Sequence, residues 1–212
     1  MSVQLDLFGA PSRMPPALPS GFRYRPDIIT PAEEGNLLAA ISGLPFREFE
    51  FHGYTGKRRV VSYGWRYDFE DRALHAADAI PAFLLPLREA AARFAGVDAD
   101  RLRQALVSEY AAGAGIGWHR DKAVFGRIVG VSLRAPCVLR LRRAQDKGWQ
   151  RARLIVAPRS AYVLAGEARA AWEHSIPPVD ALRYSVTFRT LCEDDSGAAP
   201  EPRRRRPTPT LA

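Results

Sequence analysis

The chain has 212 residues, of which 47% are apolar and 25% are charged, the balance of a soluble globular protein with one ordinary domain. No apolar run reaches the roughly 18 residues of a membrane-spanning helix, and the N-terminus lacks the apolar core of a secretory signal. The two cysteines, Cys137 and Cys192, are too few for a disulfide framework. We therefore expect a cytoplasmic protein.

Positive charge is concentrated in the part of the chain that we expect to fold. The chain has 31 Lys and Arg against 23 Asp and Glu, a net charge of +8. At the N-terminus Asp6 cancels Arg13, and in the C-terminal tail four acids cancel the arginine run 203–206, so neither end carries the excess. A basic domain favours polyanionic partners such as nucleic acids. General arginine enrichment of the source proteome is the alternative explanation.

The chain divides into three parts by composition. Residues 1–20 are rich in Pro, Ser and Ala, which predicts a flexible leader. We expect residues 21–192 to form one domain and residues 193–212 to be a disordered, Pro-rich tail. The domain begins with helical signals. Thr30 and Glu33, with a proline between them, form a capping box for a helix that ends near residue 43.

A second apolar pattern with helical spacing runs from about Pro81 to Phe94 and stops at Gly96. Pro86 falls inside this pattern, so the helix is either kinked there or begins after it. Beyond Gly96 the period changes to two, which predicts strands at 105–110, 128–133, 137–142, 153–156, 161–164 and 182–189. Helices followed by many short strands predict an α+β fold, with supporting N-terminal helices on a β-sandwich or jelly roll.

Three residues have the types and spacing of a mononuclear iron site. His119 and Asp121 form a His-x-Asp pair, whose side chains point to the same side of an extended chain. His174 follows a separate predicted strand and would complete the set from the opposite side. Two histidines and one carboxylate are the facial triad of non-haem Fe(II) oxygenases, which leaves coordination positions for a 2-oxo acid and dioxygen. Taken alone, a His-x-Asp pair is also commonly a surface hydrogen bond.

Two arginines follow the triad on the last predicted strand. Arg183 and Arg189 lie six residues apart and share one face of the strand with Ser185 and Thr187. A buried arginine binds the distal carboxylate of a 2-oxo diacid in a bidentate manner. A solvated polar strand face is the alternative interpretation.

The segments HRD, WEHS and RYSVTFR, in this order, resemble the AlkB family of 2-oxoglutarate and Fe(II)-dependent dioxygenases. The resemblance covers about residues 51–191 and implies a double-stranded β-helix, or jelly roll. It implies that His119, Asp121 and His174 bind Fe(II). It further implies that Arg183 binds the distal carboxylate of 2-oxoglutarate, that Arg189 lies at its other end by the metal, and that Tyr110 helps to hold it.

The sequence departs from the family pattern at three positions. Ser108 and Ser185 stand where the family often has asparagine, so both keep a hydroxyl for the cosubstrate but with shorter reach. Ala123 replaces an acidic residue that would contact the target base, which leaves the base preference open.

The segment 51–71 resembles the nucleotide-recognition lid of the same family. It interleaves arginines with aromatic side chains, a combination that suits stacking on a flipped or single-stranded base while cations contact the phosphates. The alternative is an edge hairpin whose aromatic rings pack inward. The predicted substrate-binding residues are Tyr54, Arg59, Trp65, Arg66 and Tyr67.

The leader contains the string QLDLF, which resembles the peptide by which bacterial repair and replication proteins bind the sliding clamp. Its predicted contacts are Gln4, Leu5, Leu7 and Phe8, although an accidental apolar patch is an equal alternative. Such a contact would favour DNA over RNA as the substrate.

The resemblance therefore predicts a monomeric enzyme that uses Fe(II), 2-oxoglutarate and dioxygen to demethylate alkylated bases in DNA, of the 1-methyladenine or 3-methylcytosine type. The same chemistry on RNA or on a protein side chain is one alternative. A non-catalytic module that binds DNA and the sliding clamp is a second.

Overall fold

The computed structural model describes residues 18–51, 54–68 and 73–192. The strands of this part are β1 (Phe22–Arg25), β2 (Arg47–Phe51), β3 (Tyr54–Tyr63), β4 (Trp65–Tyr67), β5 (Leu74–Ala76), β6 (Gln104–Tyr110), β7 (Ile116–His119), β8 (Phe125–Leu133), β9 (Cys137–Gln145), β10 (Gly148–Val156), β11 (Ala161–Leu164), β12 (Glu173–Ile176) and β13 (Arg183–Leu191). The helices are α1 (Pro31–Ser42), α2 (Leu85–Ala95) and α3 (Gly166–Ala170), with short 3₁₀ turns η1 (Ala82–Leu84) and η2 (Ala99–Arg101).

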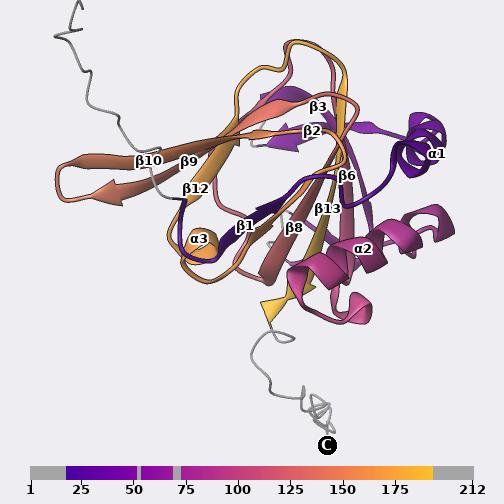
Figure 1. Cartoon of the computed structure of the whole chain (residues 1–212), viewed down its shortest axis with the longest axis horizontal. Helices are drawn as coiled ribbons and strands as arrows, with labels where there is room; N and C mark the ends of the chain where they lie inside the picture. The colour runs from indigo at the N-terminus through magenta and orange to yellow at the C-terminus, as the bar shows by residue number, and fades with distance from the viewer. Residues whose placement is uncertain (1–17, 52–53, 69–72, 193–212) are drawn as a thin grey trace, which may run out of the picture.

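Two antiparallel sheets face each other (Figure 1). The larger sheet has the strand order β1-β11-β8-β13-β6-β3-β2, and the smaller one has the order β10-β9-β12-β7. Strands β4 and β5 form a separate two-stranded hairpin. This arrangement of mostly antiparallel strands with few helices is the predicted jelly roll, so the predicted fold class is confirmed.

The two faces of the larger sheet have different roles. Along β13, the side chains of Tyr184, Val186 and Phe188 join an apolar cluster with residues of α1 and α2. The alternate residues, which include Arg183 and Arg189, face the smaller sheet. Figure 1 shows both long helices on the same side of the larger sheet. The helices therefore cover one face, and the other face is left for polar side chains between the sheets.

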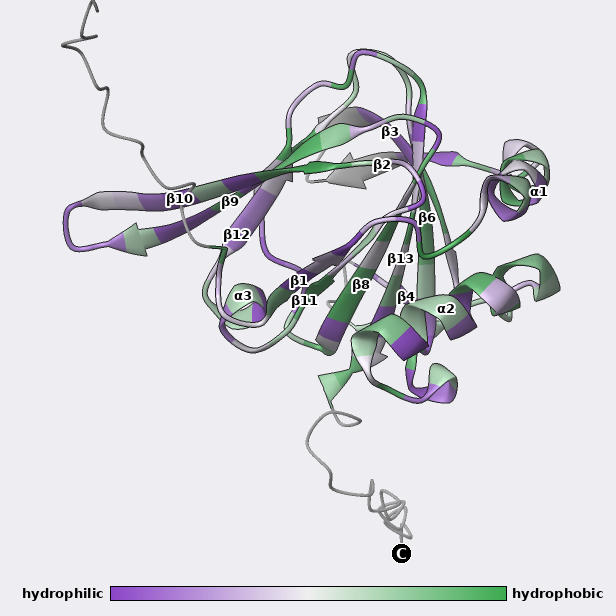
Figure 2. Ribbon diagram, viewed as in Figure 1, coloured by the Kyte–Doolittle hydropathy of each residue, from purple (hydrophilic) through white to green (hydrophobic). Residues whose placement is uncertain are grey.

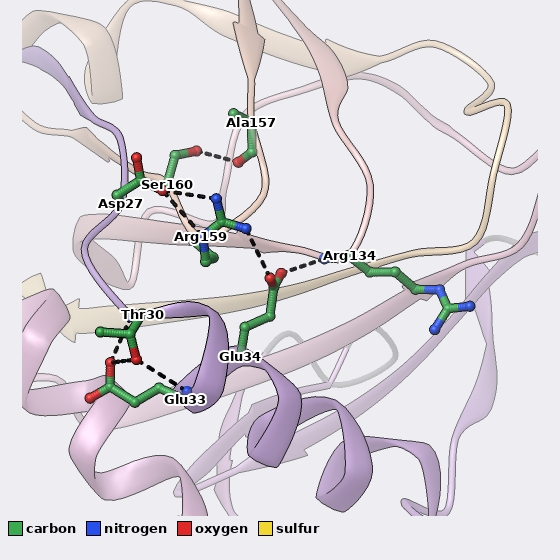
Figure 3. A network of polar contacts seen from close by, with 8 residues as sticks. All are labelled: Asp27, Thr30, Glu33, Glu34, Arg134, Ala157, Arg159 and Ser160. Atoms are coloured by element: carbon green, nitrogen blue, oxygen red, sulfur yellow. Dashed lines mark hydrogen bonds and ion pairs between the residues drawn. The ribbon is translucent and has the colours of Figure 1, made fainter.

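Helix α1 begins with the predicted capping box (Figure 3). The Thr30 hydroxyl accepts a hydrogen bond from the Glu33 amide at 3.2 Å, and the Glu33 carboxylate accepts one from the Thr30 amide at 2.7 Å. The next residue, Glu34, is buried and accepts hydrogen bonds from the Arg134 amide at 2.8 Å and the Arg159 guanidinium at 3.3 Å. These contacts fix the helix against two loops of the larger sheet.

Helix α2 shows how the chain accommodates Pro86. The turn η1 precedes the helix, and Pro86 lies in its first turn, where the missing amide hydrogen has no intrahelical partner to lose. The helix ends at Gly96, whose φ of 70° closes it in the left-handed conformation. The helix begins one residue before this proline, so no kink is required.

The sequence prediction missed several short elements. Strands β1, β7 and β12 have four residues each, and α3 has five, so none of them gives a periodic signal of useful length. The hairpin of β9 and β10 is longer than predicted and extends beyond the sheets in Figure 1. The predicted strands were shorter because both strands carry polar residues toward the turn.

No helix among the described residues is long and apolar enough to cross a membrane. The predicted clamp-binding peptide, Gln4 to Phe8, and the predicted tail, 193–212, lie outside the described residues. The described part begins at residue 18, so most of the predicted leader also lies outside it.

Candidate metal and cosubstrate site

The three predicted metal ligands come together between the sheets. His119 ends β7 and is paired directly with His174 of β12, and Asp121 follows β7 by two residues. One ligand atom from each of the three residues lies within 4.8 Å of the others. The Asp121 carboxylate is 3.6 Å from Nε2 of His174. The geometry therefore supports binding of one metal ion by two imidazoles and one carboxylate.

The backbone selects the tautomer of His119. Its Nδ1 lies 2.9 Å from the carbonyl oxygen of Gly117, so in the neutral ring Nδ1 carries the hydrogen and donates it. The lone pair of Nε2 is then available to a metal ion. This is the usual way in which a backbone carbonyl orients a ligand histidine.

The electrostatics of the cluster also favour a cation. Burial lowers the pKa of His174 to about 3 and lowers that of His119 from its usual value, so both rings are neutral at physiological pH. Burial alone would raise the pKa of Asp121, but the Arg189 guanidinium and the two histidines outweigh it and hold this pKa well below its usual range. The cluster thus offers two neutral nitrogens and one carboxylate, the protonation states that metal binding requires.

Arg189 orients the metal-binding carboxylate. Its Nε and Nη2 donate to one oxygen of Asp121 at 2.8 and 2.6 Å, which leaves the other oxygen on the side of His174. Its Nη1 donates to the side chain of Gln104 at 2.8 Å, and Gln104 in turn donates to the backbone carbonyl of Trp65 at 3.0 Å. Sequence reasoning missed Gln104, because its contact depends on the pairing of β6 with β13, which places it opposite Arg189.

Arg183 forms a second, deeper part of the site. Its side chain is 1% exposed, its Nε donates to the Ser132 hydroxyl at 3.2 Å, and its guanidinium lies 5.0 Å from the ring centre of Tyr110. Its Nη1 is buried and has no hydrogen-bond partner among the described residues. A buried guanidinium with an unused donor fits a carboxylate ligand, which is what 2-oxoglutarate would supply.

Three buried serines lie side by side on the strands next to Arg183. Ser185 of β13 is paired with Ser108 of β6 on one side and with Ser132 of β8 on the other, and all three are buried. Ser108, Ser185 and Tyr110 were predicted from the sequence, whereas Ser132 was not. Tyr162 was also missed. Its ring lies against Gly130 of β8, where a Cβ atom would be 2.6 Å from the phenol oxygen.

The structure does not place the predicted lid residues together. Trp65 and Tyr67 pack against the apolar cluster between the sheets, and the Lys122 ammonium lies 5.2 Å from the ring centre of Tyr67. Arg66 is on the other face of β4 and forms an ion pair with Asp68 at 3.1 Å. Tyr54 begins β3, but its side chain lies outside the described set.

The structure does not bring Arg59 to the site. Arg59 is paired with Glu109 and forms an ion pair with it at 2.6 Å, on the helix-covered face of the larger sheet. Its neighbour Arg58 lies on the face toward the site, buried, with its guanidinium 5.9 Å from the ring centre of Tyr110. The face on which each residue of this pair lies depends on the register of β3 with β6, which the sequence alone does not reveal.

A groove of about 1060 Å³ opens beside the metal cluster. Its acidic lining residues are Asp121 and Glu173, and Ala123 also lines it. Its basic lining residues are Arg101, Arg120, Lys122, Arg127 and Arg169. Several of these side chains also bond to backbone carbonyls, as Arg169 does to those of residues 122, 125 and 126. The groove nevertheless carries a positive charge next to the metal ligands.

Comparison with known proteins identifies the family. The sequence profile of the 2OG-Fe(II) oxygenase superfamily matches residues 22–189, which include the whole metal cluster and both arginines. The chain belongs to this superfamily. As an oxygenase of this kind, it uses Fe(II), 2-oxoglutarate and dioxygen, and it is an enzyme.

The chain is also similar to individual proteins, among them homologues of AlkB-like oxygenases. It is 31% identical over 196 residues to the alkylated DNA repair protein ALKBH8 homolog of Arabidopsis thaliana, across 80% of this chain but only 55% of that protein. It is 27% identical over 190 residues to the uncharacterized protein L905 of Acanthamoeba polyphaga mimivirus, across 82% of this chain and 87% of that one. The solved structure of OsALKBH1 shares the fold, with a TM-score of 0.63 and 14% identity over 82% of this chain and 98% of that chain.

The residues present fit the cofactors of the superfamily. His119, Asp121 and His174 would hold Fe(II), and Arg183 would bind the distal carboxylate of 2-oxoglutarate beside Tyr110. When bound, Fe(II), 2-oxoglutarate and dioxygen supply an oxidant that hydroxylates a C–H bond and release succinate and carbon dioxide. Arg189 is a positioning residue in this site, because it holds the carboxylate of Asp121 without offering a ligand itself.

Proposed function

We propose that this AlkB-like oxygenase demethylates alkylated bases of the 1-methyladenine or 3-methylcytosine type in DNA and so repairs alkylation damage. The observation that carries this proposal is the basic groove at the metal cluster. Five of its lining side chains are arginine or lysine, against the two acids Asp121 and Glu173. Asp121 is itself tied to Arg189, so little negative charge remains to oppose a phosphate backbone.

The aromatic side chains near the groove support a nucleobase as the target. Tyr67 and Trp65 lie on the same face of β4, and Lys122, the residue after Asp121, covers the ring of Tyr67. A base brought to the metal would meet this aromatic wall on one side. Stacking of a base on an aromatic ring contributes about 1–3 kcal/mol and tolerates any base, which suits an enzyme that acts on single-stranded or flipped nucleotides.

The similarity to the Arabidopsis relative, which is named an alkylated DNA repair protein homolog, supports the same substrate class. In the proposed reaction the chain holds the methyl group of the base close to His119 and Asp121, where the methyl carbon is hydroxylated. The resulting hemiaminal breaks its C–N bond to give formaldehyde and the repaired base. Ala123 places no polar side chain beside the base, so discrimination between adenine and cytosine would depend on shape and stacking.

Mass spectrometry of a methylated oligonucleotide tests this proposal directly. Single-stranded DNA with one 1-methyladenine is incubated with the protein, Fe(II), 2-oxoglutarate and ascorbate in air. Loss of one methylene mass unit is expected, together with succinate. The His119→Ala variant, which removes one metal ligand, should give neither product. Asp121→Asn should also be inactive, whereas Asp180→Asn, which removes an exposed carboxylate that is not part of the cluster, should retain activity.

The same assay separates the alternative functions. Succinate without loss of the methyl group would contradict the DNA substrate, and matched RNA and methylated peptides would then be tested in its place. If the chain binds the metal but forms neither succinate nor demethylated DNA, this result would contradict the enzymatic proposal. It would favour a module that only binds nucleic acid.

A further inference from the structure

The smaller sheet has an outer face that the metal site does not use. Side chains alternate along β7 and β12, so the residues next to His119 and His174 point away from the metal. On β9 and β10, directly paired residues share a face, and Arg142 is paired with Arg151 and also with Glu173. We call this surface the outer arginine face, and its members are Trp118, Arg140, Arg142, Trp149, Arg151, Arg153 and Glu173.

The outer arginine face holds four arginines and one acid. Arg142 forms an ion pair with Glu173 at 2.6 Å, and Arg140 donates to the Ser175 hydroxyl at 3.0 Å. Arg151 and Arg153 are exposed, and neither has an ion pair with any carboxylate of the described chain. Each lies directly opposite another arginine, because Arg151 is paired with Arg142 and Arg153 with Arg140. Like charges in such pairs destabilise a sheet, so stability of the fold does not account for them.

Aromatic rings alternate with these cations. The guanidinium of Arg142 lies 4.4 Å from the ring centre of Trp118 and 4.1 Å from that of Trp149, so it sits between two indoles. The guanidinium of Arg140 lies 5.0 Å from Trp118. Trp149 is 40% exposed although it is a large apolar residue. Cations and accessible aromatic rings on one strand surface are what a flexible nucleic-acid strand needs, because phosphates meet the arginines and bases stack on the rings.

The outer arginine face is continuous with the groove at the metal. Strand β7 forms the edge of the smaller sheet, and it carries Trp118 on the outer face and His119 on the inner one. Glu173 lines the groove and also pairs with Arg142 of the outer face. A strand with one base at the metal can therefore pass over the edge of β7 and continue along β9 and β10. Figure 2 shows polar and apolar positions alternating along these two strands.

We propose that the outer arginine face binds the single-stranded nucleic acid that flanks the target nucleotide. This inference rests on the proposed function, because it takes a nucleic-acid strand as the substrate. The face would extend the contact from the base at the metal to several neighbouring nucleotides. Its ligand chemistry is a phosphodiester backbone with unpaired bases.

Salt-dependent binding of unmodified DNA tests the inference without requiring turnover. An end-labelled oligothymidylate of about 12 nucleotides, within the usual site sizes for single strands, is titrated with the full chain, and fluorescence anisotropy is followed at several salt concentrations. Each phosphate contact contributes about 0.7 to the slope of log K against log salt for single strands. Arg151→Gln with Arg153→Gln should therefore reduce the slope by about 1.4.

Two further variants make the result specific. Trp149→Ala should weaken binding about five-fold or more through the lost stacking. Arg25→Gln with Arg93→Gln removes the same charge from exposed positions on other elements and should change the slope much less. Melting temperatures would verify that each variant is folded.

The possible outcomes separate this inference from the proposed function. An unchanged slope in the Arg151 and Arg153 double variant would overturn the inference, even if the natural chain demethylates DNA. A reduced slope with no effect of Trp149→Ala would also overturn it, since a simple polyanion site would then be sufficient. A reduced slope and weaker stacking, in a chain that demethylates no DNA or RNA, would support the outer face while contradicting the proposed reaction.

Discussion

Replacement of the buried Arg183 by an apolar residue should make the cosubstrate-free protein more stable, not less. The Arg183 guanidinium is buried, and among the described residues it has the Ser132 hydroxyl and the Tyr110 ring as partners but no carboxylate. Burial of a charge without an opposite charge costs several kcal/mol, and a cation–π contact offsets only about 2 kcal/mol of this. We therefore expect Arg183→Met to raise the free energy of unfolding of the cosubstrate-free protein, by about 1–4 kcal/mol.

The same substitution should remove stabilisation by the cosubstrate. A ligand at 100 times its Kd stabilises the native state by about 2.7 kcal/mol. For a domain of this size, about 1 kcal/mol shifts Tm by about 2–4 °C, so 2-oxoglutarate should raise the Tm of the natural protein by about 5–10 °C. Arg183→Met should show no such rise. The assay is urea unfolding without cosubstrate, followed by thermal unfolding with Mn²⁺ and increasing 2-oxoglutarate.

Arg25→Met serves as the control, because Arg25 is exposed on β1. It should change neither the free energy of unfolding nor the response to 2-oxoglutarate. A clear loss of stability in Arg183→Met would refute the reasoning, since it would mean that the guanidinium is already compensated in the native state. A full Tm rise in that variant would show that a different residue binds the distal carboxylate.

Three other predictions follow from buried groups of the site. Burial lowers the pKa of His174 from 6.5 to about 3, so between these pH values only the unfolded chain binds the proton. The free energy of unfolding of the metal-free protein should therefore fall as the pH is lowered from 6.5 to about 3. The urea midpoint of the His174→Gln variant should depend less on pH than that of the natural protein. Gln104→Leu leaves an Arg189 donor unpaired and should cost about 1–3 kcal/mol by urea unfolding, whereas a loss below about 0.5 kcal/mol would contradict the role of this bridge. Gly130→Ala forces a Cβ atom into the Tyr162 ring and should cost about 1–3 kcal/mol, most of which Tyr162→Leu should restore; additive effects in the double-mutant cycle would exclude the contact.

Local signals in the sequence were sufficient for helices α1 and α2 and for the last strand. Thr30 and Glu33 form their capping box from side chains three residues apart, and Gly96 ends α2 by its own backbone conformation. The two-residue period of β13 places Arg183 and Arg189 on one face whatever the rest of the fold does. These features could be predicted because the interactions that cause them lie within one element.

Features that depend on pairing between strands could not be predicted in the same way. The face of Arg59 follows from its pairing with Glu109, and β2 and β3 contain a register shift nearby. The contact of Gln104 with Arg189 also needs the register of β6 against β13. A shift of one residue would exchange the two faces of a strand, and the sequence of a single strand does not exclude such a shift.

The pairing of β7 with β12 determines both surfaces of the smaller sheet. Because His119 lies directly opposite His174, the two imidazoles meet on the inner face, with ring centres 4.2 Å apart. The same register requires Trp118 and Glu173 to point outward, where they meet Arg142. A slip of one residue would place an indole and a carboxylate between the sheets and expose the metal ligands. A single register therefore builds the metal site and, on its reverse side, the outer arginine face, so a substrate strand that bends around the edge of β7 would contact both.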